Sequence, residues 1–338
     1  MDNLTQTLTA VAISHTGINR KTRFATLTLI IGANLPDIDV ISRLKGTAAY
    51  LEYHRGITDS ILGVNVLALL LAGAVYWLGR TAKPKHGLPV AGWWILLAAW
   101  LGTTSHLLLD YSNSYGIRLF LPFSGRWYAW DIMYFFDPLL LAVLILGLGL
   151  PAILRLVSEE VGAKKVQTNR GAVFCLCALV ALWGLRDFSH RRALNMLRGH
   201  TYHEMNPLQV GAFPSPANPF DWIGVVETQS AFTVLPVDTL KEDIDSGNAR
   251  VFHKPDASPA LKAASETRVG RIFLESARSP WGQVEESEDG YNVSIRDLRF
   301  YNPFSRTRNF VMNVKLDKNL SVLTQSFHFW SPEQEDRF

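Results

Sequence analysis

Long stretches without a charged residue fill much of the first 186 residues of this 338-residue chain, and they constrain its fold most. Residues 61–78 and 138–154 carry no charge, and residues 88–109 carry only His106 as a titratable group. Each stretch is close to the ~20 residues that an α-helix needs to cross the hydrocarbon core of a membrane. A fourth stretch, residues 171–185, is shorter but also apolar. We therefore expect an α-helical transmembrane bundle with four strong spans.

Two weaker apolar segments, residues 4–18 and 24–36, precede these spans. At about 1.5 Å of rise per residue they are short for full crossings. We expect two short N-terminal helices that are partly buried in the membrane. A helix in the core of a soluble protein would have a similar composition.

Lys and Arg concentrate in three short loops, and cytoplasmic loops of membrane proteins are enriched in these residues. If the segments cross the membrane in alternation, all three loops fall on the same, cytoplasmic side. The opposite face then receives residues 36–60, residues 110–137 and everything after Arg186, so the C-terminal part would be periplasmic in a bacterial-type inner membrane. The basic residues are Arg20, Lys21 and Arg23 in the first loop, Arg80, Lys83 and Lys85 in the second, and Arg155, Lys164, Lys165 and Arg170 in the third.

The chain after residue 186 is typical of a soluble α+β or mainly β domain. Residues 187–197 favour a polar helix, and a proline-rich connector follows. Residues 222–228 and 231–235 predict a β-hairpin, and residues 310–316 alternate before a turn at 317–319 and a second strand-like run. We expect three parts: a helical membrane domain (1–186), a helical and proline-rich connector (187–221) and an extracytoplasmic β-rich domain (222–338).

Charge and cysteine content argue against two classes of function. The net charge is +3 and no basic tract is interleaved with aromatic residues, so nucleic-acid binding is not expected. Cys175 and Cys177 lie together in an apolar run, where we expect buried, inert thiols rather than a redox or metal-binding pair.

Two acids directly follow the second short segment. Asp37 and Asp39 stand just after Pro36, which disfavours continuation of the preceding helix. They are therefore expected on a loop or at the start of a new helix. Helix capping is the simpler interpretation, because Asp favours helix N-termini. A divalent cation held by both acids is the alternative.

A polar segment precedes the first strong span. His54 and Asp59 in this segment are potential metal ligands, and Arg55 could hold an anionic oxygen through two hydrogen bonds. The alternative is an interfacial loop in which Asp59 caps the following helix. The segment alone favours neither interpretation.

His106 and Asp110 form the sharpest local signal. They are four residues apart, so they share one face of a helix, and they lie at the end of an apolar span. A polar pair in that position is costly without a partner, which makes a function the default expectation. Neutral imidazole and carboxylate are suitable ligands for zinc or a similar ion. A structural hydrogen bond between the two side chains is the alternative.

Two further acids border the loop before residue 138. Asp137 precedes a proline that opens the next span, so capping explains it well. Asp131 lies between aromatic residues and has no such explanation. His15 is a weaker candidate, because it is expected near the cytoplasmic end of its segment.

The predicted topology places these motifs on one face of the membrane. The expected partners of the protein are the lipid bilayer and an unidentified small-molecule or lipid substrate. A divalent metal ion, with zinc as the expected one, would lower the pKa of its bound water and polarise an ester or phosphoester. An unligated carboxylate would act as general base. We therefore predict a membrane-embedded metal-dependent hydrolase. The predicted metal ligands are Asp37, His54, Asp59, His106 and Asp110, and the predicted catalytic residues are Asp39, Arg55 and Asp131.

Five segments carry a family resemblance: residues 2–5, 34–39, 54–60, 106–116 and 130–138. In order and spacing they resemble the YdjM/YbcI-type inner-membrane metal-dependent hydrolases. The resemblance implies a relation to zinc-dependent phospholipase C and nuclease-type helical hydrolases, whose zinc sites use His and Asp. It names no substrate.

The chain departs from this family pattern at two positions. Gln6 stands where a His follows the N-terminal Asp-x-x-Thr, and Asp59 replaces the last His of His-Arg-Gly-x-Thr-His. Asp can bind a metal, whereas Gln is a poor ligand. The resemblance therefore implies a changed metal affinity or identity.

A non-enzymatic function is the alternative. The bundle would be a membrane anchor or scaffold that presents the β-rich domain to a protein partner, and the polar motifs would only stabilise helix ends. This hypothesis predicts that alanine at His106 lowers stability without changing the affinity for any ligand. A transporter is less favoured, because the strong spans hold no deep charge and the two halves show no matching broken helices.

Overall fold

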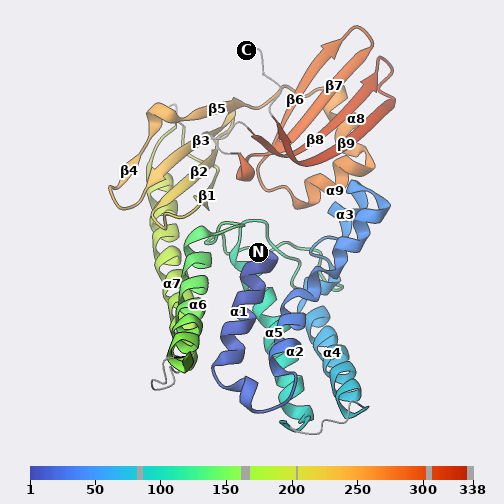
Figure 1. Cartoon of the computed structure of the whole chain (residues 1–338). Helices are drawn as coiled ribbons and strands as arrows, with labels where there is room; N and C mark the ends of the chain where they lie inside the picture. Colours follow the sequence, from blue (N-terminus) through green and yellow to red (C-terminus); the bar gives the residue numbers. More distant parts are fainter. Residues whose placement is uncertain (82–86, 161–167, 203–204, 302–306, 333–338) are drawn as a thin grey trace. The chain divides into compact units, whose positions relative to one another are not determined.

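The computed structural model describes residues 1–81, 87–160, 168–202, 205–301 and 307–332, which form two compact units (Figure 1). We call them the helical unit and the sheet unit. The helical unit comprises Met1–Val40, Arg55–Asp187 and Pro216–Pro219. The sheet unit comprises Ile41–His54, Phe188–Ser215 and Phe220–Phe338.

Four helices of the described residues are long and apolar enough to cross a membrane, which confirms the predicted spans. They are α4 (Ile61–Thr81), α5 (Gly92–Ser112), α6 (Pro138–Glu160) and α7 (Thr168–Gly199).

The two short N-terminal helices are also present, as α1 (Asn3–His15) and α2 (Ala25–Asn34). Helix α2 ends before Pro36, as predicted. A 3-10 helix, η2 (Pro36–Lys45), starts at this proline and is bent by 44° from α2. Taken as one bent span, α2 and η2 would make a fifth crossing. Three further short elements of this region are η1 (Ile18–Arg20), α3 (Thr47–Tyr53) and η3 (Ile57–Asp59).

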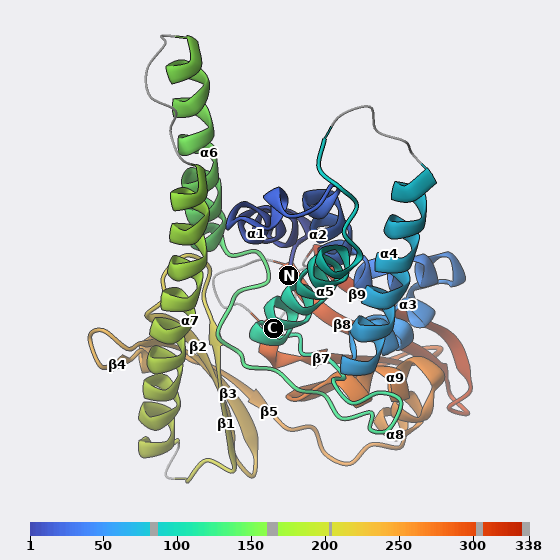
Figure 2. The same ribbon diagram turned by 90° about the horizontal axis from the view of Figure 1, so that it is seen from below.

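Helix α5 lies between α2 and α4 at the centre of the helical unit (Figure 2). Its contact with α1 and α2 is made by small and branched side chains, among them Leu29, Ala33 and Ala98. Its contact with α4 is similar, with Ala68 and Ala99 buried. Small residues let helix backbones approach closely in a membrane, where lipid supplies no hydrophobic drive for helix association.

The flanks of the three basic loops gather at one end of the helical unit. The Arg20 guanidinium donates to Asn169 Oδ1 (2.8 Å) at the start of α7. The Ala91 amide donates to Thr22 Oγ1 (2.9 Å) just before α5. His106 and Asp110 lie toward the other end of α5, near its last residue Ser112. This arrangement agrees with the alternating crossings expected from the sequence. The side of the membrane that each end faces stays a prediction.

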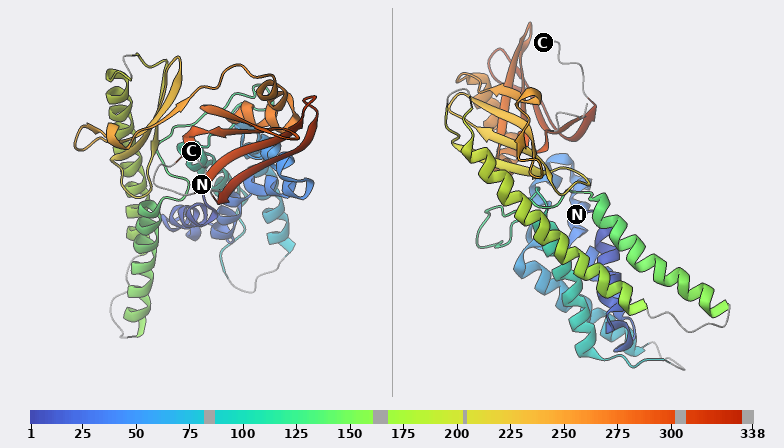
Figure 3. Two further views of the ribbon diagram at one scale, coloured as in Figure 1. Left: turned by 90° about the horizontal axis from the view of Figure 1, so that it is seen from above. Right: turned by 90° about the vertical axis from the view of Figure 1, so that its left-hand side faces the viewer.

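Helices α6 and α7 form an antiparallel pair (Figure 3, right). Arg186 was expected to mark the end of the last span, yet α7 continues through it to Gly199. Arg186 Nη2 lies 2.7 Å from Asp137 Oδ2, and both side chains are buried. Asp137 also caps α6 as predicted, since its Oδ1 accepts the Leu140 amide (3.0 Å). Cys175 is buried as expected, whereas Cys177 is exposed, because it points to another face of the helix.

The described residues of the sheet unit form two antiparallel sheets. The first has the order β1-β2-β3-β4, with β5 also paired to β3. It confirms the predicted hairpin, whose strands place Val225 opposite Val234. Strand β1 lies inside the segment expected to be a connector. The strands are β1 (Gln209–Pro214), β2 (Asp221–Glu227), β3 (Ala231–Asp238), β4 (Asp243–Ile244) and β5 (Arg250–His253), with η4 (Ser246–Asn248) before β5.

The second sheet has the order β6-β7-β8-β9, and α8 and α9 pack against it (Figure 3). It confirms the predicted pair of strands around residues 317–319. Helix α3 also belongs to this unit. It packs against α9 and β9, and Glu52 pairs with Arg268 (2.8 Å). The elements are α8 (Pro259–Glu266), α9 (Arg268–Ser276), β6 (Pro280–Ser287), β7 (Gly290–Asp297), η5 (Leu298–Phe300), β8 (Thr307–Asp317) and β9 (Val322–Pro332).

Candidate metal centre

The His106 side chain is fully buried, and a backbone carbonyl holds one of its two ring nitrogens. Nδ1 lies 2.7 Å from the Ala33 carbonyl oxygen in the last turn of α2. A carbonyl can only accept a hydrogen bond, so Nδ1 carries a proton and donates it. Such a bond on the far nitrogen is the usual way in which a protein orients a metal-binding histidine. Nε2, on the other side of the ring, lies 3.0 Å from Asp59 Oδ1.

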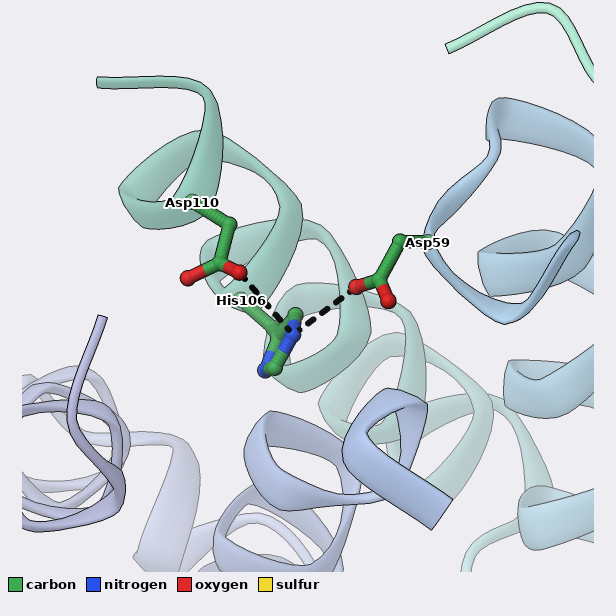
Figure 4. A group of neighbouring side chains, drawn as sticks. All are labelled: Asp59, His106 and Asp110. Carbon is green, nitrogen blue, oxygen red and sulfur yellow. Dashed lines mark hydrogen bonds and ion pairs between the residues drawn. The ribbon is translucent and has the colours of Figure 1, made fainter. Parts of the chain in front are cut away.

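Three carboxylates surround Nε2 of His106. The nearest oxygen is Asp59 Oδ1 at 3.0 Å, followed by Asp37 Oδ1 at 3.8 Å and Asp110 Oδ2 at 4.0 Å. The side chains of Asp59 and Asp110 are buried, whereas that of Asp37 is 23% exposed. Figure 4 shows how Asp59 and Asp110 converge on the imidazole from different elements. Asp37 is therefore the member of the group that solvent or a ligand can reach.

The geometry of this group fits a metal ion. Among the described residues, Asp59, His106 and Asp110 can each offer one ligand atom, and these atoms lie within 4.8 Å of one another. A tetrahedral zinc ion with bonds of about 2.0–2.2 Å keeps its ligand atoms roughly 3.4 Å apart. The distances of 3.0 and 4.0 Å from Nε2 lie on either side of that value. One imidazole and two carboxylates leave a further position open, as in catalytic zinc sites.

Asp59 is available to His106 because its neighbour caps the following helix. Ser60 Oγ accepts the Gly63 amide (2.9 Å) in the first turn of α4. The alternative in which Asp59 itself caps this helix is therefore wrong. Asp110 lies on the same face of α5 as His106, one turn later, as the sequence spacing predicted.

The negative charge of the Asp110 carboxylate is compensated by contacts with charged and polar groups. Arg55 Nη2 lies 2.7 Å from Asp110 Oδ2, the oxygen that faces His106. Gln6 Nε2 donates to Asp110 Oδ1 (3.2 Å), and the Met1 amino nitrogen also contacts that oxygen. Gln6, which departs from the family pattern, is thus in direct contact with the cluster formed by Asp59, His106 and Asp110.

Arg55 is buried and bonded on several sides. Its Nη1 donates to Asn113 Oδ1 and to the Gly116 carbonyl, both at 3.0 Å. Its backbone has a left-handed φ of 53°, and its amide donates to Asp39 Oδ2 (2.7 Å). Asp39 therefore holds the backbone of Arg55, and Arg55 in turn holds the Asp110 carboxylate.

Two of the predicted site residues, His54 and Asp131, are not among the three residues that converge in the candidate metal centre. His54 groups with the sheet unit and stacks on Tyr50, with ring centroids 4.5 Å apart. Asp131 is half-buried with a left-handed φ of 61°, on a segment whose neighbouring amides donate to the carbonyls of residues 111 and 112. The assignment of His54 as a ligand and of Asp131 as a catalytic residue stays a prediction.

Two contributors to the site were missed in the sequence. The Ala33 carbonyl is a backbone group, so no residue type signals it. Asn113 had a signal, because it is a polar residue three positions after Asp110, at the end of α5. Its Oδ1 accepts from Arg55 and also from the Tyr115 amide (2.8 Å), so it anchors the turn behind the cluster.

Comparison with known proteins gives matches in both parts of the chain. The model of a family described as YdjM inner membrane protein matches residues 1–193, which include the whole cluster. A second model, described as YfhP C-terminal alpha/beta plait domain, matches residues 259–337. No solved structure matches.

One relative is the Bacillus subtilis (strain 168) protein named Uncharacterized protein YfhP. It is 34% identical over 109 residues, which are 32% of this chain and 31% of the relative. The match therefore spans about a third of the relative's length.

Proposed function

The chain belongs to the YdjM inner membrane protein family and carries a C-terminal alpha/beta plait domain, and we propose that its helical unit is a metal-dependent hydrolase. The observation that carries the proposal is the buried His106. Its Nδ1 is tied to a carbonyl while Nε2 faces three carboxylates. Three buried or half-buried acids around one imidazole are costly without a cation, because burial disfavours uncompensated charge.

In this proposal, His106, Asp59 and Asp110 would hold a divalent ion, with zinc expected from the donor set. When bound, such an ion would supply a water of lowered pKa and polarise the scissile bond. Asp37 would accept a proton at Oδ1, because this oxygen lies 3.8 Å from Nε2 and its side chain is the exposed one.

Arg55 and Asp39 have positioning roles in the proposed site. Arg55 balances part of the negative charge on Asp110, and its side chain is committed to Asn113, Gly116 and Asp110. Asp39 fixes the Arg55 backbone in its left-handed conformation. These contacts keep Asp110 Oδ2 directed toward His106.

The substrate class that fits is a phosphoester or a lipid-like ester at the membrane face. The cluster lies near the end of α5, where a membrane span meets the polar boundary. We place this face and the sheet unit on the periplasmic side of the inner membrane, from the distribution of Lys and Arg.

Metal analysis of the detergent-purified protein tests the proposal. The wild type should retain zinc or manganese in a stoichiometric amount, and His106→Ala and Asp110→Asn should lose it. His15→Ala is the matched control. His15 is half-buried, and its Nδ1 contacts the Val11 carbonyl (2.9 Å) on α1, at the end of the bundle away from the cluster. Equal metal content in all four proteins, or none in any, would contradict the proposal.

A non-catalytic anchor is the second candidate. It is favoured by the internal compensation of Asp110, which already contacts Arg55 and Gln6. On this alternative His106→Ala lowers the stability of the protein, and neither the wild type nor the variant responds to added metal. The same metal analysis, repeated as a thermal-stability measurement with and without zinc, separates the two candidates.

A further inference from the structure

Helices α2 and α5 touch backbone to backbone at a pair of glycines. A Cβ atom added to Gly102 would lie 2.7 Å from the Leu29 carbonyl oxygen and 3.1 Å from the Gly32 Cα. A Cβ atom added to Gly32 would lie 3.0 Å from the Ala99 carbonyl oxygen. Because backbone atoms cannot rotate away as a side chain can, any larger residue at Gly102 must push the helices apart.

This contact lies one helical turn from the candidate metal ligand. Gly102 precedes His106 by four residues on the same face of α5, and Gly32 directly precedes Ala33 on α2. Ala33 is in the last turn of its helix, where carbonyls have no intrahelical partner. The close approach of the two helices thus brings an available acceptor to 2.7 Å from His106 Nδ1.

The bond to the Ala33 carbonyl fixes the direction of the His106 ring. With Nδ1 held 2.7 Å from that oxygen, Nε2 on the other side of the ring faces Asp59 Oδ1 at 3.0 Å and Asp110 Oδ2 at 4.0 Å. If the two helices moved apart, this bond would lengthen and the ring could turn away from the two carboxylates.

We propose that Gly32 and Gly102 are positioning residues of the metal centre, because their contact holds the Ala33 carbonyl against His106 Nδ1 and so directs Nε2 toward Asp59 and Asp110. The inference rests on the proposed function. It adds that the metal affinity depends on the spacing of α2 and α5, and not only on the ligands.

A graded series of glycine substitutions tests this inference in the full-length protein. Gly73→Ala on α4 is the control, since an added Cβ there meets nothing within 4 Å. Gly32→Ala introduces a mild overlap and Gly102→Ala a severe one. Each purified, metal-free protein is titrated with Co²⁺, whose visible absorption reports ligand number and geometry, and its thermal stability is measured in parallel.

The affinity for Co²⁺ should fall in the order Gly73→Ala, Gly32→Ala, Gly102→Ala, with a loss of about 10–100-fold for the last, as for other contacts that orient a ligand. The absorption spectrum should change in Gly102→Ala as well. If Gly102→Ala does not fold, Gly32→Ala decides. Wild-type affinity and spectrum in a folded Gly32→Ala and Gly102→Ala would overturn the inference alone, whereas a wild type that binds no Co²⁺ would overturn the proposed function with it.

Discussion

Two buried Arg–Asp ion pairs of the helical unit have the same length but different surroundings, and the difference yields a sharp prediction. Arg55 and Asp110 are 2.7 Å apart, as are Arg186 and Asp137, and all four side chains are at most 2% exposed. The oxygen of Asp110 that Arg55 contacts also faces His106. The Arg186 pair joins α6 to α7 and includes none of the three cluster residues.

Without metal, Arg55→Met and Arg186→Met should destabilise the protein by similar amounts. Two unit charges at 2.7 Å attract each other by about 6 kcal/mol at an effective dielectric constant of about 20. Desolvation offsets part of this attraction, and removing one partner of a buried pair typically costs about 3–5 kcal/mol because it leaves the other charge uncompensated. We expect both variants to fall in that range.

Zinc should distinguish the two variants. In Arg55→Met a metal ion at the cluster can neutralise Asp110, so zinc should restore most of the lost stability. A recovery of ~3 kcal/mol corresponds to roughly 100-fold tighter binding than in the wild type. In Arg186→Met zinc should stabilise no more than it stabilises the wild type.

Unfolding by sodium dodecyl sulfate in mixed micelles, followed by circular dichroism with zinc or with a chelator, measures these free energies. Equal effects of zinc on both variants would refute the reasoning, because the metal would then not share Asp110 with Arg55. Weaker zinc binding in Arg55→Met than in the wild type would instead show that Arg55 orients the carboxylate more than it competes for it.

Two further substitutions test the site and the helix packing. Gln6→His is expected to tighten zinc binding by at least about tenfold, or ~1.4 kcal/mol, since an imidazole would replace a poor ligand beside Asp110; isothermal titration measures it, and an unchanged affinity would contradict the geometry. Gly147→Ala is expected to destabilise the protein by about 1–3 kcal/mol, because its Cβ would lie 2.4 Å from the buried Cys175 Sγ. Gly149→Ala, with nothing within 4 Å of its Cβ, is the control in the same unfolding assay.

Much of the helical unit could be predicted from the sequence because the membrane imposes simple rules. Apolar runs without charge must be helical, and alternation of basic loops fixes which ends lie together. The spacing of His106 and Asp110 placed both on one helix face. The expectation that the segments of Asp59 and His106 share one end of the bundle brought these two residues together in the predicted site, and in the structure Asp59 Oδ1 lies 3.0 Å from His106 Nε2.

Other features depend on contacts that residue types do not encode. The sequence marked Arg186 as the end of a span, because a charge inside a membrane helix is unfavourable without a partner. Its partner, Asp137, stands directly before α6. The pair can be recognised only once the packing of α6 against α7 is known. The Ala33 carbonyl and the Gly32–Gly102 contact are backbone features, and they need the helix spacing itself.

The position of α3 has a consequence for how the two parts of this protein were inherited. Helix α3 lies within the segment that matches the YdjM family, yet it packs against α9 and β9 of the plait domain, and its Tyr50 and Leu51 are buried. A chain cut after the last span would lose the surface that covers this helix. The plait domain and the loop between Asp39 and Arg55 should therefore vary together in evolution, so that neither can be exchanged for a distant relative's version alone.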